Sequence, residues 1–326
     1  MRTPITVAAT LAALLIPVAA ASAGTSSVAV LGDTPYGNVQ LANFPTDIDD
    51  LNADQDVDAV VHLGDIKSGS TKCTDEYFAT IRAQFDRLKD PLVYTPGDNE
   101  WTDCHRVNNG AYNPLERLAK IREVFFNRHY RTLGRPMPII DQSSRGLPEN
   151  KLWSKQRVVL STVHVVGSND SLAPWTGATA PTAEQQAEHD ARLRGNLAWI
   201  RSTFSAAKLT NARAVVLGMQ ADMWDPAAAA AGQTTAFVPI VEEIAKQAKS
   251  FKKPVLLING DSHLFTQDTP LATPGPLYPN AVAAPNLTRV TVQGSTNSPR
   301  DWLKLRLSTS GAPLSWSRVP FTSQAS

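Results

Sequence analysis

The chain of 326 residues has almost no excess of charge and only two cysteines. Its 31 basic residues nearly balance its 30 acidic residues, so the formal net charge is +1. Such a balance provides no electrostatic field that would attract nucleic acid or an anionic membrane surface. Beyond the first 20 residues, no apolar run is long enough to cross a bilayer. The length and the 42% content of hydrophobic residues are those of a globular protein.

The N-terminus carries the one long apolar run. Arg2 precedes "ITVAATLAALLIPVAA", and small residues follow at 21–23. This pattern predicts a cleaved secretory signal over residues 1–23, with an uncleaved anchor as the alternative. We therefore expect an exported protein, periplasmic or extracellular, in which residues 24–326 form a single domain. The sequence leaves its oligomeric state open.

The two cysteines can form one disulfide in an oxidising compartment. Cys73 and Cys104 each lie a few residues beyond a Gly-Asp pair that ends an apolar run, at Asp65 and Asp98. If those two runs are neighbouring strands, the loops that carry the cysteines emerge side by side. The alternative is two unrelated buried thiols.

Hydrophobic periodicity predicts alternating strands and helices. The expected strands are 27–31, 58–63, 92–95, 157–166, 213–218, 255–259, 289–293 and 302–308, and the expected helices are 75–88, 114–127, 183–204 and 234–249. This alternation indicates an α/β fold with a mainly parallel core. The C-terminal part is more purely β.

Four of the apolar runs are followed by Gly-Asp, at Asp33, Asp65, Asp98 and Asp261. Ligands of open α/β sheets bind at the carboxyl ends of the strands, so these carboxylates are expected to face one region. Like charges held together require a neutralising partner, and a multivalent cation is the simplest one. The alternative is that each aspartate caps the helix or turn that follows it.

These motifs stand in an order that resembles the calcineurin-like metallophosphoesterases. The matching segments are "GDTPY" at 32–36, "GDIKSG" at 64–69, "GDNEW" at 97–101, "GMQAD" at 218–222 and "GDSH" at 260–263. The resemblance implies a two-sheet α/β/β/α sandwich with two metal ions bridged by an aspartate.

Carried over position by position, the resemblance implies a ligand set in which Asp65 bridges the two metals. The implied metal ligands are Asp33, Asp65, Asp98, Gln220, Asp261 and His263, with Asp222 as a rival to Gln220. The implied catalytic residues are Asp65, Asn99 and His263. Four family histidines are replaced, by Pro35, Asn99, Gln220 and Asp261. Tyr36 is a neighbour that could compensate for Pro35.

The departures from the family pattern shape the expected chemistry. A site rich in oxygen donors favours Mg²⁺, Mn²⁺ or Ca²⁺ over Zn²⁺ or iron. The resemblance implies hydrolysis of a small-molecule phosphoester by a metal-bound hydroxide. His105 and Arg106, in "WTDCHRVNN", could contact the phosphate, although a surface-loop position explains both more simply.

Two other functions stay open. Asn99 replaces the histidine that assists the leaving group, so the chain could be a weakly active or inactive metal- or ligand-binding protein on the same fold. Alternatively, "NGDSHLF" resembles the Gly-Asp-Ser block of certain serine esterases, with Ser262 as nucleophile. That block comes late in this chain and leaves the other three Gly-Asp pairs unexplained.

Overall fold

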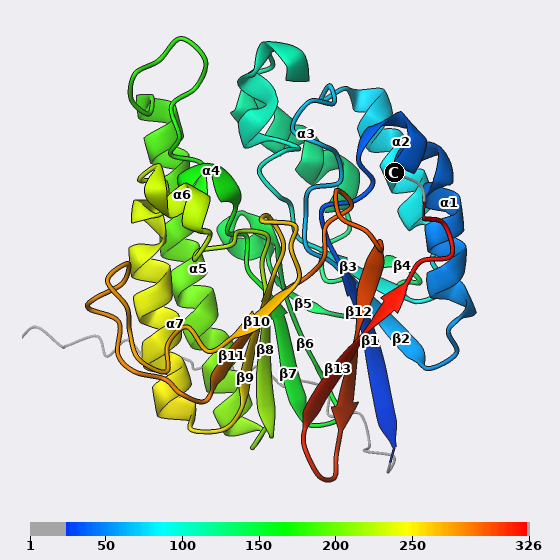
Figure 1. The fold of residues 1–326 in the computed structure, drawn as a ribbon, viewed down its shortest axis with the longest axis vertical. Coiled ribbons are helices and arrows are strands. Elements are labelled where there is room, and N and C mark those ends of the chain that lie inside the picture. The colour runs from blue at the N-terminus through cyan, green and yellow to red at the C-terminus, as the bar shows by residue number, and fades with distance from the viewer. Residues whose placement is uncertain (1–23, 325–326) are drawn as a thin grey trace, which may run out of the picture.

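Two mixed sheets pack face to face, and helices cover both outer faces (Figure 1). This arrangement is seen in a computed structural model that describes residues 24–324. The predicted α/β/β/α sandwich is confirmed. The predicted signal sequence, residues 1–23, lies outside the described residues.

The first sheet has six strands in the order β13-β12-β1-β2-β3-β4. Its three central strands are parallel, and the outer three are antiparallel to their neighbours. The strands are β1 (Thr25–Leu31), β2 (Val57–His62), β3 (Pro91–Tyr94), β4 (Leu133–Gly134), β12 (Asp301–Ser308) and β13 (Leu314–Pro320).

The second sheet has seven strands in the order β10-β11-β9-β8-β7-β6-β5. Four neighbouring strands, β11, β9, β8 and β7, run parallel. The strands are β5 (Ile140–Gln142), β6 (Leu147–Lys155), β7 (Val158–Thr162), β8 (Ala214–Gly218), β9 (Val255–Asn259), β10 (Thr266–Asp268) and β11 (Leu287–Thr291). The predicted mainly parallel core is therefore present in both sheets.

The helices divide between the two sheets. The first sheet is covered by α1 (Gly37–Ala53), α2 (Asp75–Phe85) and α3 (Pro114–Phe125), and the second by α5 (Ala183–Leu209) and α7 (Val238–Phe251). The short helix α6 (Pro226–Ala230) lies in a loop, and so does the segment labelled α4 (Gly167–Asp170), which is a left-handed turn at Ser168 and Asn169. The long helix α5 begins at a capping box, in which Thr182 and Gln185 satisfy each other's backbone N–H groups.

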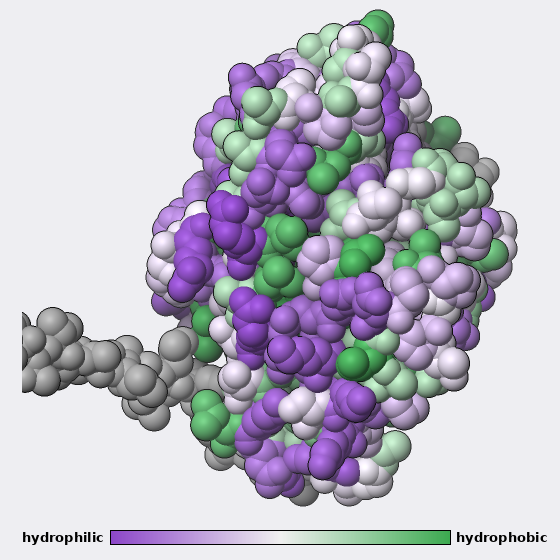
Figure 2. All heavy atoms as spheres, turned by 90° about the vertical axis from the view of Figure 1, so that its left-hand side faces the viewer, coloured by the Kyte–Doolittle hydropathy of each residue, from purple (hydrophilic) through white to green (hydrophobic). Residues whose placement is uncertain are grey.

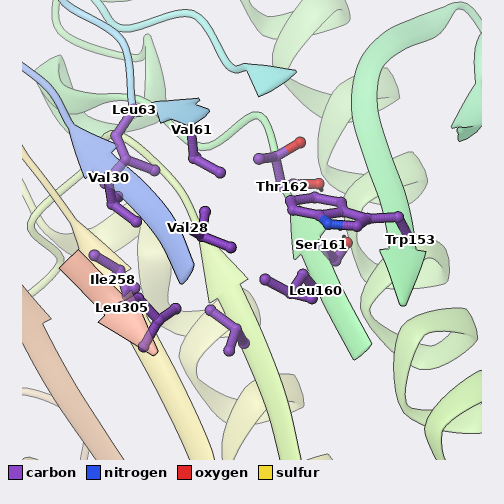
Figure 3. A pocket seen from close by; sticks show the side chains of 12 residues that line it. Val28, Val30, Val61, Leu63, Trp153, Leu160, Ser161, Thr162, Ile258 and Leu305 are labelled. Atoms are coloured by element: carbon purple, nitrogen blue, oxygen red, sulfur yellow. Dashed lines mark hydrogen bonds between the residues drawn. The ribbon is translucent and has the colours of Figure 1, made fainter. Parts of the chain in front are cut away.

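The space between the sheets is filled by aliphatic side chains from both (Figure 3). Val28 and Val30 of β1 face Leu160 of β7 and Ile258 of β9 across it. The cavity that remains has a volume of about 10 Å³, which is too small for any ligand larger than water. The space between the sheets therefore has no room for a ligand.

Most predicted elements match the structure to within a few residues, and the exceptions have local causes. The strand expected over 157–166 ends at Thr162, where the chain turns toward the strand ends. The helix expected from residue 234 starts as a short 3-10 turn, and α7 begins only at Val238. Helix α1 was not expected; its buried face carries the polar Gln40 and Asp47 beside Phe44, Ile48 and Leu51.

Figure 2 shows the face at the left of Figure 1, where α5 and α7 lie. Hydrophobic residues form small separate patches there, surrounded by hydrophilic ones. Among the helices of residues 24–324, none combines the length and the apolar character needed to span a membrane.

Candidate metal centre

The four predicted aspartates follow parallel strands from both sheets. Asp33, Asp65 and Asp98 come after β1, β2 and β3, and Asp261 comes after β9. The carboxyl ends of these strands meet at one edge of the sandwich, so the side chains converge there. Asp33, Asp65 and Asp261 have positive φ angles of 52°, 55° and 74°. Such left-handed backbone is strained for residues with a side chain, and strain of this kind gathers at functional sites.

Glycines beside the aspartates allow the loops to approach one another closely. A Cβ atom on Gly97 would lie 2.5 Å from the Asp65 backbone nitrogen and would overlap the Asp65 Oδ1. A Cβ on Gly260 would overlap the Asp33 carboxylate in the same way. The backbone of Gly97 and of Gly260 thus lies directly against an aspartate carboxylate, where the Cβ atom of any other residue would clash.

The converging side chains form two groups that could each hold a metal ion. Asp33, Asp65 and His263 form one group, and Asp65, Asp98 and Asp261 form the other. Within each group the ligand atoms all lie within 4.8 Å of one another. Asp65 belongs to both, which is the position expected of a bridging carboxylate. The donors are mostly carboxylate oxygens, so the set fits hard divalent cations.

The electrostatics of the cluster also fit a cation. Burial, followed by repulsion from Asp98 and other carboxylates, raises the pKa of Asp65 and of Asp261 well above the ordinary value. Burial also raises the pKa of Asp98, against the opposing effects of Ser168 and Arg106. A divalent cation would reverse these shifts by favouring the charged carboxylates.

Asp65 is oriented by donors on three sides. The Asn99 backbone N–H donates to its Oδ1 at 3.1 Å, and the Asn99 amide donates to its Oδ2 at 2.8 Å. The Tyr36 hydroxyl donates to the same Oδ2 at 3.1 Å. Burial and the nearby Asp65 and Asp33 raise the pKa of Tyr36 well above its usual value, which keeps the phenol protonated. Tyr36, which stands next to the missing histidine, therefore lies within the site as a neutral donor.

His263 presents one ring nitrogen to the cluster. Its Nε2 lies 3.4 Å from the Asp33 Oδ1 and 3.3 Å from the Tyr36 hydroxyl. Its Nδ1 pairs with the Thr296 hydroxyl at 2.8 Å, which fixes the ring from behind. This is the usual arrangement of a metal-binding histidine, with a second polar partner on the outer nitrogen.

Gln220 lies at the centre of the cluster but presents its amide nitrogen there. Its Nε2 donates to Asp98 at 3.0 Å and to Asp65 at 3.3 Å, while its Oε1 accepts the Gly167 N–H at 2.6 Å. In this orientation Gln220 stabilises carboxylates rather than offering a ligand oxygen. Its rival Asp222 is paired with Arg289 and is therefore already neutralised.

The two residues predicted to contact phosphate have different surroundings. The Arg106 guanidinium is held by Asp103 at 2.7 Å and is partly exposed, and its charge acts to lower the pKa of Asp98. His105 instead turns to a neighbouring loop, where its Nδ1 accepts the Thr176 N–H at 2.9 Å. Arg106 is thus electrostatically part of the site, whereas His105 is engaged elsewhere.

The predicted disulfide is confirmed. Cys73 and Cys104 are bonded across a Cα–Cα distance of 5.9 Å. The bond joins the loops that follow Asp65 and Asp98, because β2 and β3 are adjacent in the sheet. It therefore ties together two of the segments that carry ligand candidates.

Two buried charged residues of the site were not predicted. Glu100 accepts hydrogen bonds from the backbone of Asp65 and Gly97, at 3.1 and 2.7 Å, and so joins two strand ends. Lys67 donates to the Asn99 carbonyl at 2.6 Å, and burial lowers its pKa to about 8. Both lie within quoted motifs, but lysine is seldom buried, and composition alone does not reveal such a position.

The esterase alternative finds no support in the surroundings of Ser262. The Ser262 hydroxyl donates to Asp222 at 2.7 Å. Within residues 24–324 no histidine hydrogen-bonds to it, and both nitrogens of His263 face other groups. A serine nucleophile needs a histidine base within hydrogen-bond reach.

A family model matches this chain, and two solved structures are similar to it. The family model described as calcineurin-like phosphoesterase matches residues 26–193. A solved structure titled as GAP50, the anchor in the inner membrane complex of Plasmodium, is similar with a TM-score of 0.50 and 10% identity, over 92% of this chain and 86% of that one. The phosphopantetheinyl hydrolase PptH of Mycobacterium tuberculosis is similar with a TM-score of 0.40 and 11% identity, over 94% of this chain and 99% of that one. A search of curated proteins returned no match.

Proposed function

Because the chain belongs to the calcineurin-like phosphoesterase family, we propose that it is an exported, metal-dependent hydrolase of small-molecule phosphoesters. The observation that carries this proposal is the pair of ligand groups that share Asp65. In this proposal residues 24–326 act as one domain after removal of residues 1–23. The Cys73–Cys104 disulfide is compatible with an oxidising compartment.

Two divalent cations are the cofactors we propose. Asp33, Asp65 and His263 would hold one, and Asp65, Asp98 and Asp261 the other. When bound, such a pair supplies positive charge that polarises a phosphoryl group and lowers the pKa of a water molecule. Mg²⁺, Mn²⁺ and Ca²⁺ suit these donors better than Zn²⁺ or iron, because four of the five ligand side chains are carboxylates and only one is an imidazole.

The protein's own side chains would orient the reactants. The protonated Tyr36 hydroxyl and the Asn99 amide lie within 3.1 Å of one another and both face Asp65. They would therefore keep the shared carboxylate in place, because the Tyr36 hydroxyl and the Asn99 amide both donate to its Oδ2. Arg106, held by Asp103, would add positive charge for the phosphate oxygens.

The site has lost its family proton donor, because Asn99 stands at the histidine position. General acid–base assistance is typically worth about 10²–10⁴-fold in rate, so slow turnover is expected. This replacement is also the observation that favours the second candidate, a metal- or ligand-binding protein of the same fold without catalysis.

The test is phosphate release from a panel of phosphoesters with Mg²⁺, Mn²⁺, Ca²⁺ or Zn²⁺ supplied. Asp65→Asn keeps the size of the side chain and removes the shared charge, so it should abolish release. Asp86→Asn is the matched control, because Asp86 is half exposed on α2 and pairs only with Arg82. Equal release by the wild type and by Asp65→Asn would contradict the proposed hydrolase. Metal binding without any release would favour the second candidate.

A further inference from the structure

The loop after β7 contains a left-handed turn that no family motif predicts. Ser168, Asn169, Asp170 and Ser171 have consecutive positive φ angles of 52°, 55°, 50° and 71°. Non-glycine residues adopt this conformation at a cost of about 1–2 kcal/mol each, so four in a row require strong support from their surroundings.

The support comes from Arg192 of α5, which is fully buried. Its guanidinium pairs with the Asp170 carboxylate and donates to the Asp170 carbonyl at 2.9 Å and to the Ser171 hydroxyl at 2.7 Å. The Asp170 carboxylate in turn accepts the Val166 N–H at 3.2 Å. The turn is therefore held rigidly from its outer side.

On its inner side the turn meets the candidate metal centre. A Cβ on Gly167 would lie 2.7 Å from an oxygen of Asp98 and 2.9 Å from an oxygen of Asp261, so Gly167 lies directly against both carboxylates. The next residue, Ser168, directs its hydroxyl to the Asp98 Oδ2 at 2.8 Å and to the Asp103 Oδ1 at 2.9 Å.

Ser168 therefore links a ligand candidate to the group that anchors the arginine. The Asp103 Oδ1 faces Ser168, while its Oδ2 holds the Arg106 guanidinium at 2.7 Å. Asp98 and Asp103 are both buried, and Ser168 is the side-chain donor that they share. Removing it would leave two buried carboxylates facing each other without that donor.

We propose that Ser168 is a positioning residue that fixes Asp98 for metal binding and Asp103 for holding Arg106. The proposal rests on the proposed function only in assuming that Asp98 binds a metal. Loss of the hydroxyl would let both carboxylates turn away from each other. The metal group that contains Asp98 would then weaken, while the group built from Asp33, Asp65 and His263 would keep its ligands.

Three variants separate the hydroxyl from the turn that carries it. Ser168→Ala removes the hydroxyl and keeps the strain. Ser168→Gly removes the hydroxyl and relieves the strain, because glycine adopts positive φ readily. Ser202→Ala is the control, since Ser202 is exposed on α5 and its hydroxyl donates to the Ala198 carbonyl instead of to the turn or the site.

The measurement is calorimetric titration of the metal-free mature chain with Mn²⁺, together with the melting temperature of each variant. Ser168→Ala and Ser168→Gly should weaken one of two Mn²⁺ sites by about 10–100-fold, the usual effect of losing a residue that orients a ligand. Ser202→Ala should bind like the wild type. Ser168→Gly should melt no lower than the wild type, which would exclude general unfolding as the cause.

The outcomes separate this inference from the proposed hydrolase. Wild-type Mn²⁺ binding by Ser168→Gly would overturn the role of Ser168 and leave the hydrolase standing. Selective weakening of one site in a protein that releases no phosphate would support Ser168 and count against the hydrolase. A wild type that binds no Mn²⁺ would overturn both.

Discussion

Replacing Gly97 with alanine tests whether the site depends on close approach of backbone to Asp65. Gly97 does not have a positive φ, so alanine carries no penalty from backbone conformation at this position. Its Cβ would nevertheless lie 2.5 Å from the Asp65 nitrogen and would overlap the Asp65 carboxylate. The backbone of Gly64 packs against the same glycine, so the clash cannot be relieved by moving a flexible side chain.

Overpacking of this kind costs about 1–3 kcal/mol, which corresponds to a fall of about 2–6 °C in melting temperature for a chain of this size. Displacement of Asp65 should also disturb both metal groups, because it is their shared member. We therefore expect Gly97→Ala to lose most of its Mn²⁺ binding while still folding.

Gly275→Ala is the control for this experiment. Gly275 also lacks a positive φ, and no atom lies within 4 Å of the position of its Cβ. Its effect should stay within about 0.5 kcal/mol, as for other surface substitutions. Differential scanning calorimetry and metal analysis on both variants give the answer. If Gly97→Ala binds Mn²⁺ as the wild type does, the tight apposition of Gly97 and Asp65 is not needed, and the reasoning is refuted.

Three further predictions follow from the charges and the covalent link around the site. Burial and Asp98 raise the pKa of Asp103 to about 7, so the folded state holds a proton that the unfolded state releases near pH 4. The stability of the metal-free protein should therefore fall as the pH rises from about 4 to about 7. A melting temperature that rises over this range would contradict the assignment. The disulfide closes a loop of 31 residues, so replacing both Cys73 and Cys104 with serine should lower the free energy of unfolding by about 3–4 kcal/mol. A urea titration measures this change, and an unchanged free energy would show that the disulfide does not stabilise the fold. Lys67→Met removes a buried cation among carboxylates and should lower the free energy of unfolding by about 3–5 kcal/mol. Lys89→Met is the control at an exposed lysine, and equal stability of the two variants would show that the buried charge is not needed.

The α/β class with a parallel core could be predicted because two simple signals agreed, whereas the two-sheet sandwich was implied by the resemblance to the calcineurin-like family. Apolar runs of strand length alternated with helical segments, and Gly-Asp pairs marked the carboxyl ends of β1, β2, β3 and β9. Helix α1 was missed although Phe44, Ile48 and Leu51 have helical spacing, because its buried face also carries the polar Gln40 and Asp47. Hydrophobic periodicity detects an element only where that element presents a continuous apolar face.

The candidate site was less accessible from sequence. The aspartates and His263 could be anticipated from their motifs, and the structure brings them together. The direction of the Gln220 amide could not be anticipated, because it depends on the Gly167 N–H from a loop 53 residues away. Ser168 has no motif at all, and its place in the site follows from a turn held by Arg192. Such contacts arise from tertiary packing and leave no local pattern.

The most direct test of the central claim is anomalous diffraction from crystals of residues 24–326 grown with Mn²⁺. The account predicts two peaks on either side of Asp65, one touching Asp33 and His263 and the other touching Asp98 and Asp261. The same crystals of Asp65→Asn should lose one or both peaks. A wild-type map with no peak at these side chains would show that the carboxylates are structural, and the claim of a two-metal centre would be wrong.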